Sequence, residues 1–175
     1  MSNNTQDNKV ITMPAELETV LFDVVSDEDR AYFLPSNFDG DYFLSGEYER
    51  LNSKNAFNRS DDHVAGSWTM AKLKSGDSFF MYPSDDAKTY TINGLDNDEI
   101  VVDNKIFGLI NTYATFDEAS CRPVAEQAIA DAYIHHTSET NEALNIVIAE
   151  LFGDDETEEL ADLKKQVYYI FELMI

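Results

Sequence analysis

The sequence has few basic residues, one cysteine and no long hydrophobic run. Lys and Arg number 12 against 34 Asp and Glu, which gives a formal net charge of −22. A surface with so few cations does not suit ordinary binding to the phosphate backbone of nucleic acids or to anionic lipid headgroups. No apolar run approaches the roughly 18 residues that a membrane span needs. These absences argue against direct contact with nucleic acid and against a membrane location.

The other absences concern the cellular compartment. Cys121 is the single cysteine, so no internal disulfide can form and a reducing cytoplasm is expected. Residues 1–9 are polar and lack the apolar core of a secretory signal. Hydrophobic residues make up 43% of the 175 residues and aromatics 12%, whereas acidic disordered chains are poor in both. We therefore expect a folded chain of one domain with at most an appendage.

The acidic charge is unevenly distributed. Residues 50–105 carry a net charge of −2, whereas residues 1–49 carry −9 and residues 106–163 carry −12. The densest run has seven acids and no base, and we take it as the candidate partner-binding surface: Glu150, Asp154, Asp155, Glu156, Glu158, Glu159 and Asp162. One interpretation is a charged surface that keeps the protein soluble. The other is mimicry of DNA, in which carboxylates arranged in a stripe stand in for phosphates.

The clearest β signal is a hairpin around residues 67–82. Two strand-like segments flank a four-residue turn in which Gly76 is placed for a positive φ angle. Further short strands are expected at residues 18–25, 89–92 and 99–102, which are short apolar or β-branched segments.

Helical spacing dominates the second half of the chain. Apolar residues recur at steps of three and four in residues 106–113, 125–133, 144–151 and 160–174. A short helix after Ser26 is expected to end at Pro35, and residues 37–46 read as a turn-rich connection. Strand patterns followed by helix patterns predict an α+β fold. We expect a small antiparallel sheet packed with three to four helices concentrated in the C-terminal half.

Three parts are predicted along the chain. Residues 1–13 are rich in Asn, Asp and Thr and are expected to form a disordered leader. Residues 14–153 form one α+β domain. Residues 154–175 form an acidic turn and an amphipathic helix that packs on that domain.

Few residues suggest chemistry. His63 follows two aspartates, but no HExxH or CxxC pattern accompanies it, so we expect it in a solvated acidic loop. His135 and His136 are neighbours on a helix and point about 100° apart, which is typical of surface or helix-end positions. No nucleophile, phosphate-binding loop or cofactor motif is found. The sequence therefore predicts a non-enzymatic protein without a cofactor, and an enzyme that uses scattered carboxylates is the weaker hypothesis.

Several segments resemble the ArdB/KlcA antirestriction family. They are similar, in order, to the family's RxxFLPxxF box, its GE pair, its W-aromatic-L-G-FYM-P hairpin, its AAGI helix and its HPEA-type ending. The matching segments are residues 30–38, 46–47, 66–83, 102–116 and 141–148. The box residues also have plain structural meanings as core, turn or strand-end residues: Arg30, Phe33, Leu34, Pro35, Trp68, Leu73, Gly76, Phe79, Met81, Pro83 and Gly108.

Departures from the family pattern occur inside the matched region of about residues 18–152. Lys105, Ile106 and Phe107 replace the small residues that precede the family's glycine, here Gly108. The family's YxWM helix is not recognisable in residues 48–62.

The resemblance implies a protein of a plasmid or phage that protects incoming DNA from type I restriction enzymes. It would act in the cytoplasm by binding a host protein, such as the restriction complex, without contacting nucleic acid or membrane. Two other hypotheses remain: an acidic DNA mimic that inhibits another DNA-binding protein, and an interaction module that docks through the helix at residues 160–174. The oligomeric state stays open between monomer and dimer.

Overall fold

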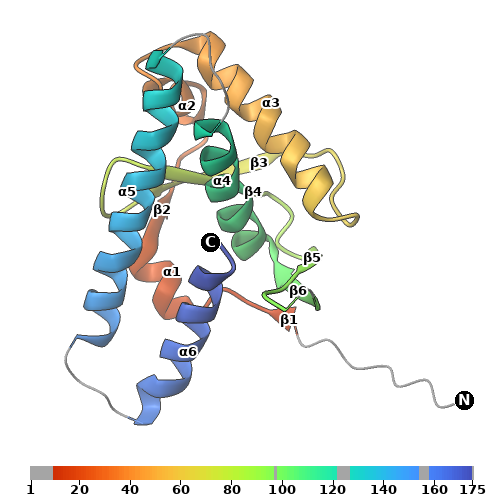
Figure 1. Ribbon diagram of the computed structural model, residues 1–175, viewed down its shortest axis with the longest axis vertical. Coiled ribbons are helices and arrows are strands. Elements are labelled where there is room, and N and C mark those ends of the chain that lie inside the picture. The colour runs from red at the N-terminus through yellow and green to blue at the C-terminus, as the bar shows by residue number, and fades with distance from the viewer. Residues whose placement is uncertain (1–9, 97, 122–126, 154–157, 175) are drawn as a thin grey trace, which may run out of the picture.

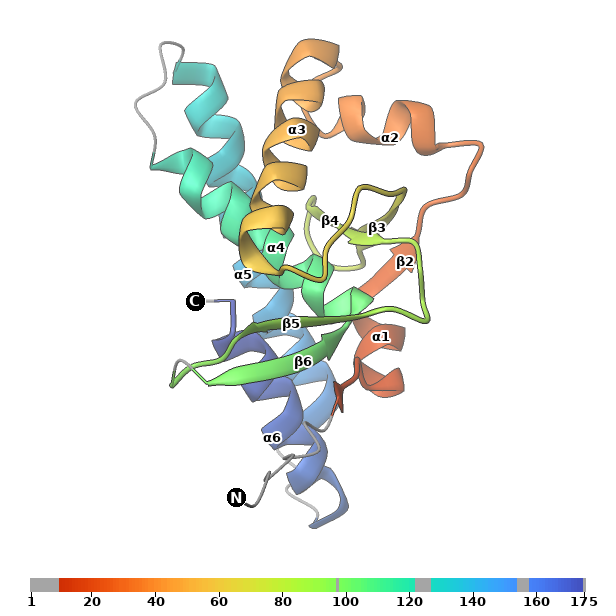
Figure 2. The same ribbon diagram turned by 90° about the vertical axis from the view of Figure 1, so that its right-hand side faces the viewer.

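Helices and strands both build this protein, whose computed structural model describes residues 10–96, 98–121, 127–153 and 158–174. Within these residues there are six helices and two three-stranded sheets (Figure 1). This mixture, with helices concentrated toward the C-terminal end, confirms the predicted α+β class. The long helix α5 runs along one side of the molecule, and strands β5 and β6 lie on the other (Figure 2).

The first sheet contains the predicted hairpin. Strands β3 (Trp68–Leu73) and β4 (Phe79–Pro83) pair antiparallel, and β2 (Phe22–Val24) joins the free edge of β3. Gly76 has a φ of +79° in the turn, as the sequence predicts. A Cβ at Gly76 would lie 2.9 Å from Oε2 of Glu139, so the turn also approaches α5 closely.

The second sheet includes residues from the segment that was expected to be a disordered leader. Strands β5 (Thr89–Asn93) and β6 (Glu99–Asp103) pair antiparallel, and β1 (Val10–Ile11) pairs parallel with β6. The expectation of disorder through residue 13 is therefore wrong for residues 10–13, because the ladder with β6 holds them. The backbone N–H of Met13 also donates to Oδ2 of Asp103 at 2.6 Å. Residues 1–9 lie outside the described residues.

Helices α1 (Ala15–Leu21) and α2 (Arg30–Ser36) differ from the sequence predictions. The segment 18–25 was expected to be extended, but it divides between α1 and β2. Leu17 and Leu21 are both fully buried at helical spacing, which explains this outcome. Pro35 lies inside α2 rather than ending it at Leu34.

Helix α3 (Tyr42–Arg59) replaces the predicted turn-rich connection from residue 42 onward. Oδ1 of Asp41 accepts hydrogen bonds from the backbone N–H groups of Phe43 and Leu44, which is the geometry of a helix N-cap. Because this cap satisfies donors that otherwise stay free, the helix starts here despite its low apolar content.

Polar side chains join α3 to the central helix α4 (Asn104–Ser120). Nδ2 of Asn111 donates to the Oδ1 atom of Asn52 at 2.9 Å, and Nδ2 of Asn55 donates to the Thr115 hydroxyl at 3.1 Å. All four residues are buried. The face of α3 that meets α4 is thus partly polar. The amides of Asn111 and Asn55 donate across the interface, whereas Nδ2 of Asn52 is buried without a hydrogen-bond partner among the described residues.

Helix α5 (Gln127–Phe152) is one continuous helix, whereas the sequence predicted separate helices for its two apolar stripes. The hydroxyls of Thr137 and Thr140 donate to backbone carbonyls four residues earlier, so the polar middle stays helical. The helix ends at Phe152, and Gly153 follows it with a φ of +45°. Residues 125 and 126, at the start of the stripe expected over residues 125–133, lie outside the described residues.

Helix α6 (Glu158–Glu172) turns its apolar side inward. Its side chains Val167 and Ile170 are fully buried and Phe171 nearly so, as is Met174 just after the helix. Among the described residues, no helix is long and apolar enough to cross a membrane.

Candidate functional site

A cleft of about 830 Å³ combines charged and buried polar groups. One wall is the α2–α3 region, residues 33–44. The hairpin tip contributes Lys72 and Asp77, and α5 contributes residues 131–136. Three segments far apart in the sequence therefore meet at this cleft.

His136 forms part of the cleft wall and is 1% exposed. Its ring stacks on Phe116 with centroids 4.9 Å apart and meets Phe79 and Phe38 edge to face. The expectation that both neighbouring histidines lie at the surface or a helix end is therefore wrong for His136, since aromatic rings from three elements enclose it. His135 does remain half exposed.

The hydrogen bonds of His136 fix its tautomer. Nε2 lies 2.9 Å from the backbone carbonyl oxygen of Asn37, and a carbonyl oxygen only accepts, so Nε2 carries the proton. Nδ1 is then a bare acceptor, and it is buried without a hydrogen-bond partner among the described residues. The burial of the ring lowers the pKa of His136, which favours this neutral form.

The cleft is acidic. Its lining includes the carboxylates of Asp39, Asp41, Asp77 and Asp131, against the single ammonium of Lys72 among the described residues. Oδ1 of Asp41 caps α3 and is therefore engaged in the fold. Among the described lining residues, carboxylates therefore outnumber ammonium groups.

Exposed aromatic side chains stand on the same two helices that line the cleft. Tyr32 on α2 is 70% exposed, and Tyr42 and Phe43 at the start of α3 are 64% and 73% exposed. Large aromatic residues in such positions are enriched where proteins bind one another.

The other buried histidine, His63, is not in a solvated loop as expected. Its ring lies among Phe57, Trp68 and Phe107, with centroid distances of 4.7, 5.4 and 5.8 Å. Asp62, the neighbouring residue, accepts the backbone N–H of Thr91 instead of facing His63. Burial lowers the pKa of His63. Phe57 and Trp68 lie within six residues of His63 in the sequence, whereas Phe107 comes from the distant helix α4.

The two buried histidines predict an acid-sensitive fold. Both have a pKa below the ordinary 6.5 because burial penalises the charged ring. The unfolded chain then binds more protons than the folded one below about pH 6.5, so the free energy of unfolding falls as the pH decreases from there. Melting temperatures measured from pH 7.5 to 5.5 should show this slope, and His63→Phe should reduce it. His135→Gln is the control, and an equal slope in wild type and His63→Phe would contradict the prediction.

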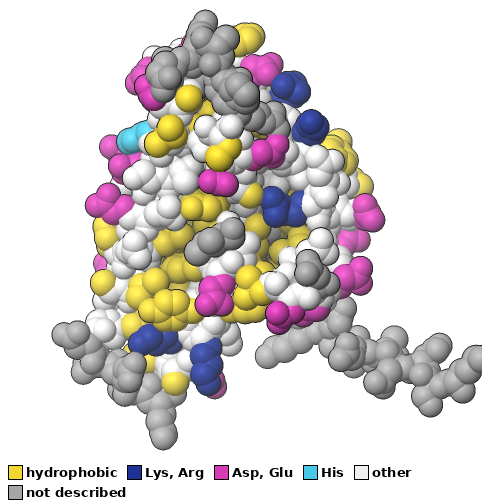
Figure 3. Space-filling model, in the orientation of Figure 1, with side chains coloured by type: hydrophobic (Ala, Val, Ile, Leu, Met, Phe, Trp, Pro, Cys, Tyr) yellow, Lys and Arg dark blue, Asp and Glu magenta, His cyan; other side chains and the backbone are white. Residues whose placement is uncertain are grey.

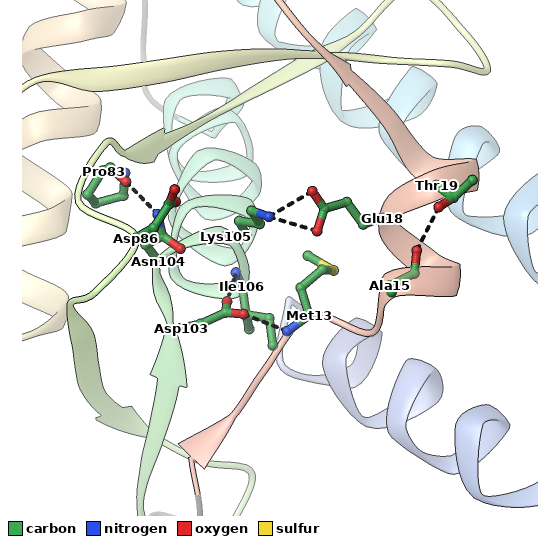
Figure 4. Close-up of polar contacts among 10 residues, drawn as sticks. All are labelled: Met13, Ala15, Glu18, Thr19, Pro83, Asp86, Asp103, Asn104, Lys105 and Ile106. Carbon is green, nitrogen blue, oxygen red and sulfur yellow. Dashed lines mark hydrogen bonds and ion pairs between the residues drawn. The ribbon is translucent and has the colours of Figure 1, made fainter.

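The junction of β6 and α4 explains one departure from the family pattern (Figure 4). Asp103 caps α4 by accepting the N–H of Ile106 at 2.8 Å. The side chain of Asn104 donates to the Pro83 carbonyl oxygen, which ties the helix start to the end of β4. Lys105 forms an ion pair with Glu18 of α1 at 2.7 Å, so this larger residue has a defined partner.

The described ends of the acidic run, the C-terminal end of α5 and the start of α6, lie at the opposite end of α5 from the cleft. Glu150 is exposed near the end of that helix. Asp162 on α6 is exposed as well, 3.8 Å from the ammonium of Lys165. Residues 154–156 lie outside the described residues, as do the side chains of residues 158 and 159.

No group of three or more His, Cys, Asp or Glu side chains that could hold a metal ion occurs in the described part of the chain. A groove of about 650 Å³ on α6, lined mainly by Phe152, Leu160, Tyr168 and Tyr169, is apolar.

A comparison with solved structures finds a similar fold. One match is a structure described as showing that the KlcA and ArdB proteins have "a novel fold and antirestriction activity against Type I DNA restriction systems in vivo but not in vitro". It aligns with a TM-score of 0.57 and 20% sequence identity, over 83% of this chain and 93% of that one. This chain shares the KlcA/ArdB fold. No family model and no curated protein matches its sequence.

The segments that resemble KlcA and ArdB contribute to the hydrophobic core of the fold. The guanidinium of Arg30 donates to the backbone carbonyl of Trp68, which joins α2 to β3. Phe33 meets Phe79 edge to face at 5.8 Å. Leu34, Pro35, Trp68, Leu73, Met81, Pro83 and Gly108 are buried.

Proposed function

We propose that this chain is an antirestriction protein that protects incoming DNA from type I restriction enzymes by binding a host protein. The observation that carries the proposal is the shared fold with a protein described as having that activity. The resemblance of the ordered sequence boxes supports it independently of the overall alignment. The binding is non-enzymatic and takes place in the cytoplasm of the host.

A host protein as the partner suits two observations. The activity of the KlcA and ArdB proteins is described as present in vivo but not in vitro, which fits a partner that only the cell supplies. The net charge of −22 favours a basic partner surface, such as the groove of a DNA-acting enzyme. Association between such surfaces is fast and sensitive to salt.

Binding through shape and local charge is preferred over DNA mimicry. A mimic needs carboxylates in a continuous stripe, whereas the acidic side chains on the face in Figure 3 lie singly or in small groups among other side chains. Docking through the apolar stripe of α6 is also disfavoured, because Val167 and Ile170 are fully buried within this chain.

The proposal predicts that expression of this protein raises the plating of unmodified phage on a host with an active type I restriction system. Neutralising the acidic run, by Asp→Asn and Glu→Gln changes at its seven acids, should reduce that protection. Exposed ion pairs contribute about 0.2 kcal/mol each at the low end, so losing seven should weaken partner binding about tenfold.

The matched control removes seven exposed acids elsewhere, with the same change in net charge: Glu16, Asp27, Glu28, Glu49, Asp61, Asp96 and Glu99. Protection should persist in this variant. Equal protection by both variants would remove the acidic run from the mechanism, and no protection by a well-expressed wild-type protein would overturn the proposed function itself.

A further inference from the structure

The groove of about 650 Å³ on α6 leaves aromatic surface open to another molecule. Its apolar walls come from Phe152 at the end of α5 and from Leu160, Tyr168 and Tyr169 of α6. Tyr168 is 39% exposed. Figure 3, in the orientation of Figure 1, shows hydrophobic side chains gathered over α6 with Lys or Arg side chains beside them. This face of α6 is separate from the apolar stripe of the same helix that is buried within the chain.

Charged side chains flank Tyr168 in a definite order. Lys164 and Lys165 lie about one helical turn before Tyr168, and Glu172 lies about one turn after it. All of them line the groove, as expected for residues spaced three or four apart on a helix. The helix therefore presents cations, an aromatic ring and a carboxylate in sequence along one face.

This order is complementary to itself when it is reversed. If two copies of α6 cross antiparallel at Tyr168, the Glu172 carboxylate of each copy meets the lysines of the other. A twofold axis through the crossing makes both charge contacts at once, as in any isologous dimer. A different protein would need the reversed pattern on a surface of its own, whereas a second copy of this chain carries it already.

We infer that two copies of this chain form a dimer through antiparallel packing of α6, with Tyr168 of each copy in the groove of the other. The inference goes beyond the proposed function and does not depend on it. A second hollow of about 260 Å³ shares Tyr168 and Glu172 with the groove, and its walls include Leu144 and Met174. The first turns of the second copy's helix lie toward this hollow, which extends the apolar contact.

The dimer should be weak and should depend on concentration. The contact of one helix pair is small, and weak transient interfaces bury less than about 1,200 Å². Two chains of net charge −22 repel each other, but at about 0.15 M salt the Debye length of about 8 Å screens charges outside the interface. Sedimentation equilibrium of the full chain from about 10 μM to about 1 mM, the range that suits such affinities, should show a monomer–dimer equilibrium.

Reversing the charge at one end of the pattern should weaken the dimer. Glu172→Lys places like charges at both symmetry-related contacts and should raise the dissociation constant at least about tenfold. Glu49→Lys is the matched control, because it makes the same change in net charge at an exposed position of α3. Both changes reduce the net negative charge, so general repulsion alone predicts stronger association for both variants.

A mixing experiment tests the antiparallel arrangement. Lys164→Glu/Lys165→Glu should also associate more weakly than the wild type, because carboxylates then meet carboxylates. An equimolar mixture of this variant with Glu172→Lys should associate at least as well as the wild type, since each variant carries the charges that the other needs. Melting temperatures close to that of the wild type show that both variants fold.

Three results would each overturn the inference. The first is a wild type that stays monomeric at the highest concentration, which would leave the groove to a different ligand. The second is a Glu172→Lys variant that dimerises as well as the wild type and the Glu49→Lys control. The third is a mixture that associates no better than its separate components.

Discussion

Replacing Gly108 with alanine should lower the free energy of unfolding by about 3 kcal/mol, at the upper end of what overpacking costs. Gly108 lies where α4 crosses β4. A Cβ placed there would lie 2.3 Å from Cβ of Tyr82 and 2.5 Å from the backbone carbonyl oxygen of Met81. These atoms belong to the strand itself, so the helix and the sheet would have to separate. Urea unfolding followed by circular dichroism measures the loss.

Gly46→Ala is the matched control, because Gly46 also lies in a helix but a Cβ there meets nothing within 4 Å. This substitution should raise the free energy of unfolding by about 0.5–1 kcal/mol, since alanine favours the helix over the unfolded chain. Similar effects at the two positions would contradict the close packing of α4 on β4.

Replacing Phe79 with alanine should cost about 3–5 kcal/mol, the usual range for a buried phenylalanine. Phe79 is 1% exposed and lies at the centre of an aromatic cluster. Its ring meets those of Phe38, Tyr48, Phe116 and His136 at centroid distances of 5.2 to 6.2 Å. The same denaturation experiment applies, and it should report the loss of a ring that joins the hairpin to α3, α4 and α5.

Phe43→Ala is the matched control, because it removes the same type of side chain from an exposed position. Phe43 carries the same side chain at the start of α3 but is largely exposed, so its loss should cost less than about 0.5 kcal/mol. A cost at Phe79 as small as that at Phe43 would show that the aromatic cluster does not hold the elements together.

Local signals in the sequence predicted the elements that depend on local chemistry. The hairpin turn needs the positive φ of Gly76, and α4 begins at Asp103 because this side chain caps it. The spacing of apolar residues in α6 likewise matches its buried side. Each of these features is decided by residues close together in the chain.

Helix α3 was not predicted from the sequence, and the reason is physical. Part of its buried face is polar, since Asn52 and Asn55 bond to residues of α4 that lie about 60 positions away. An apolar stripe could therefore not reveal it, and the cap at Asp41 was the one local signal. His63 was misplaced for a related reason: its ring also stacks on Phe107, 44 residues away, and this contact is a property of the tertiary structure.

The candidate site also has one part that a local sequence pattern indicated and another part that depends on tertiary contacts. The resemblance pointed to the box at residues 30–38, which forms part of the cleft wall. The meeting of this box with Asp77 and His136 depends on three elements that no local pattern connects. The role of the acidic run from Glu150 to Asp162 stays a prediction.

Phage plating on a restricting host tests the central claim most directly. The host should carry an active type I restriction system and express the wild type, Gly46→Ala or Gly108→Ala at matched levels. The account predicts that the wild type and Gly46→Ala raise the plating of unmodified phage toward the level on a non-restricting host, and that the destabilised Gly108→Ala does so less. Unchanged plating with the folded, well-expressed wild type would contradict it.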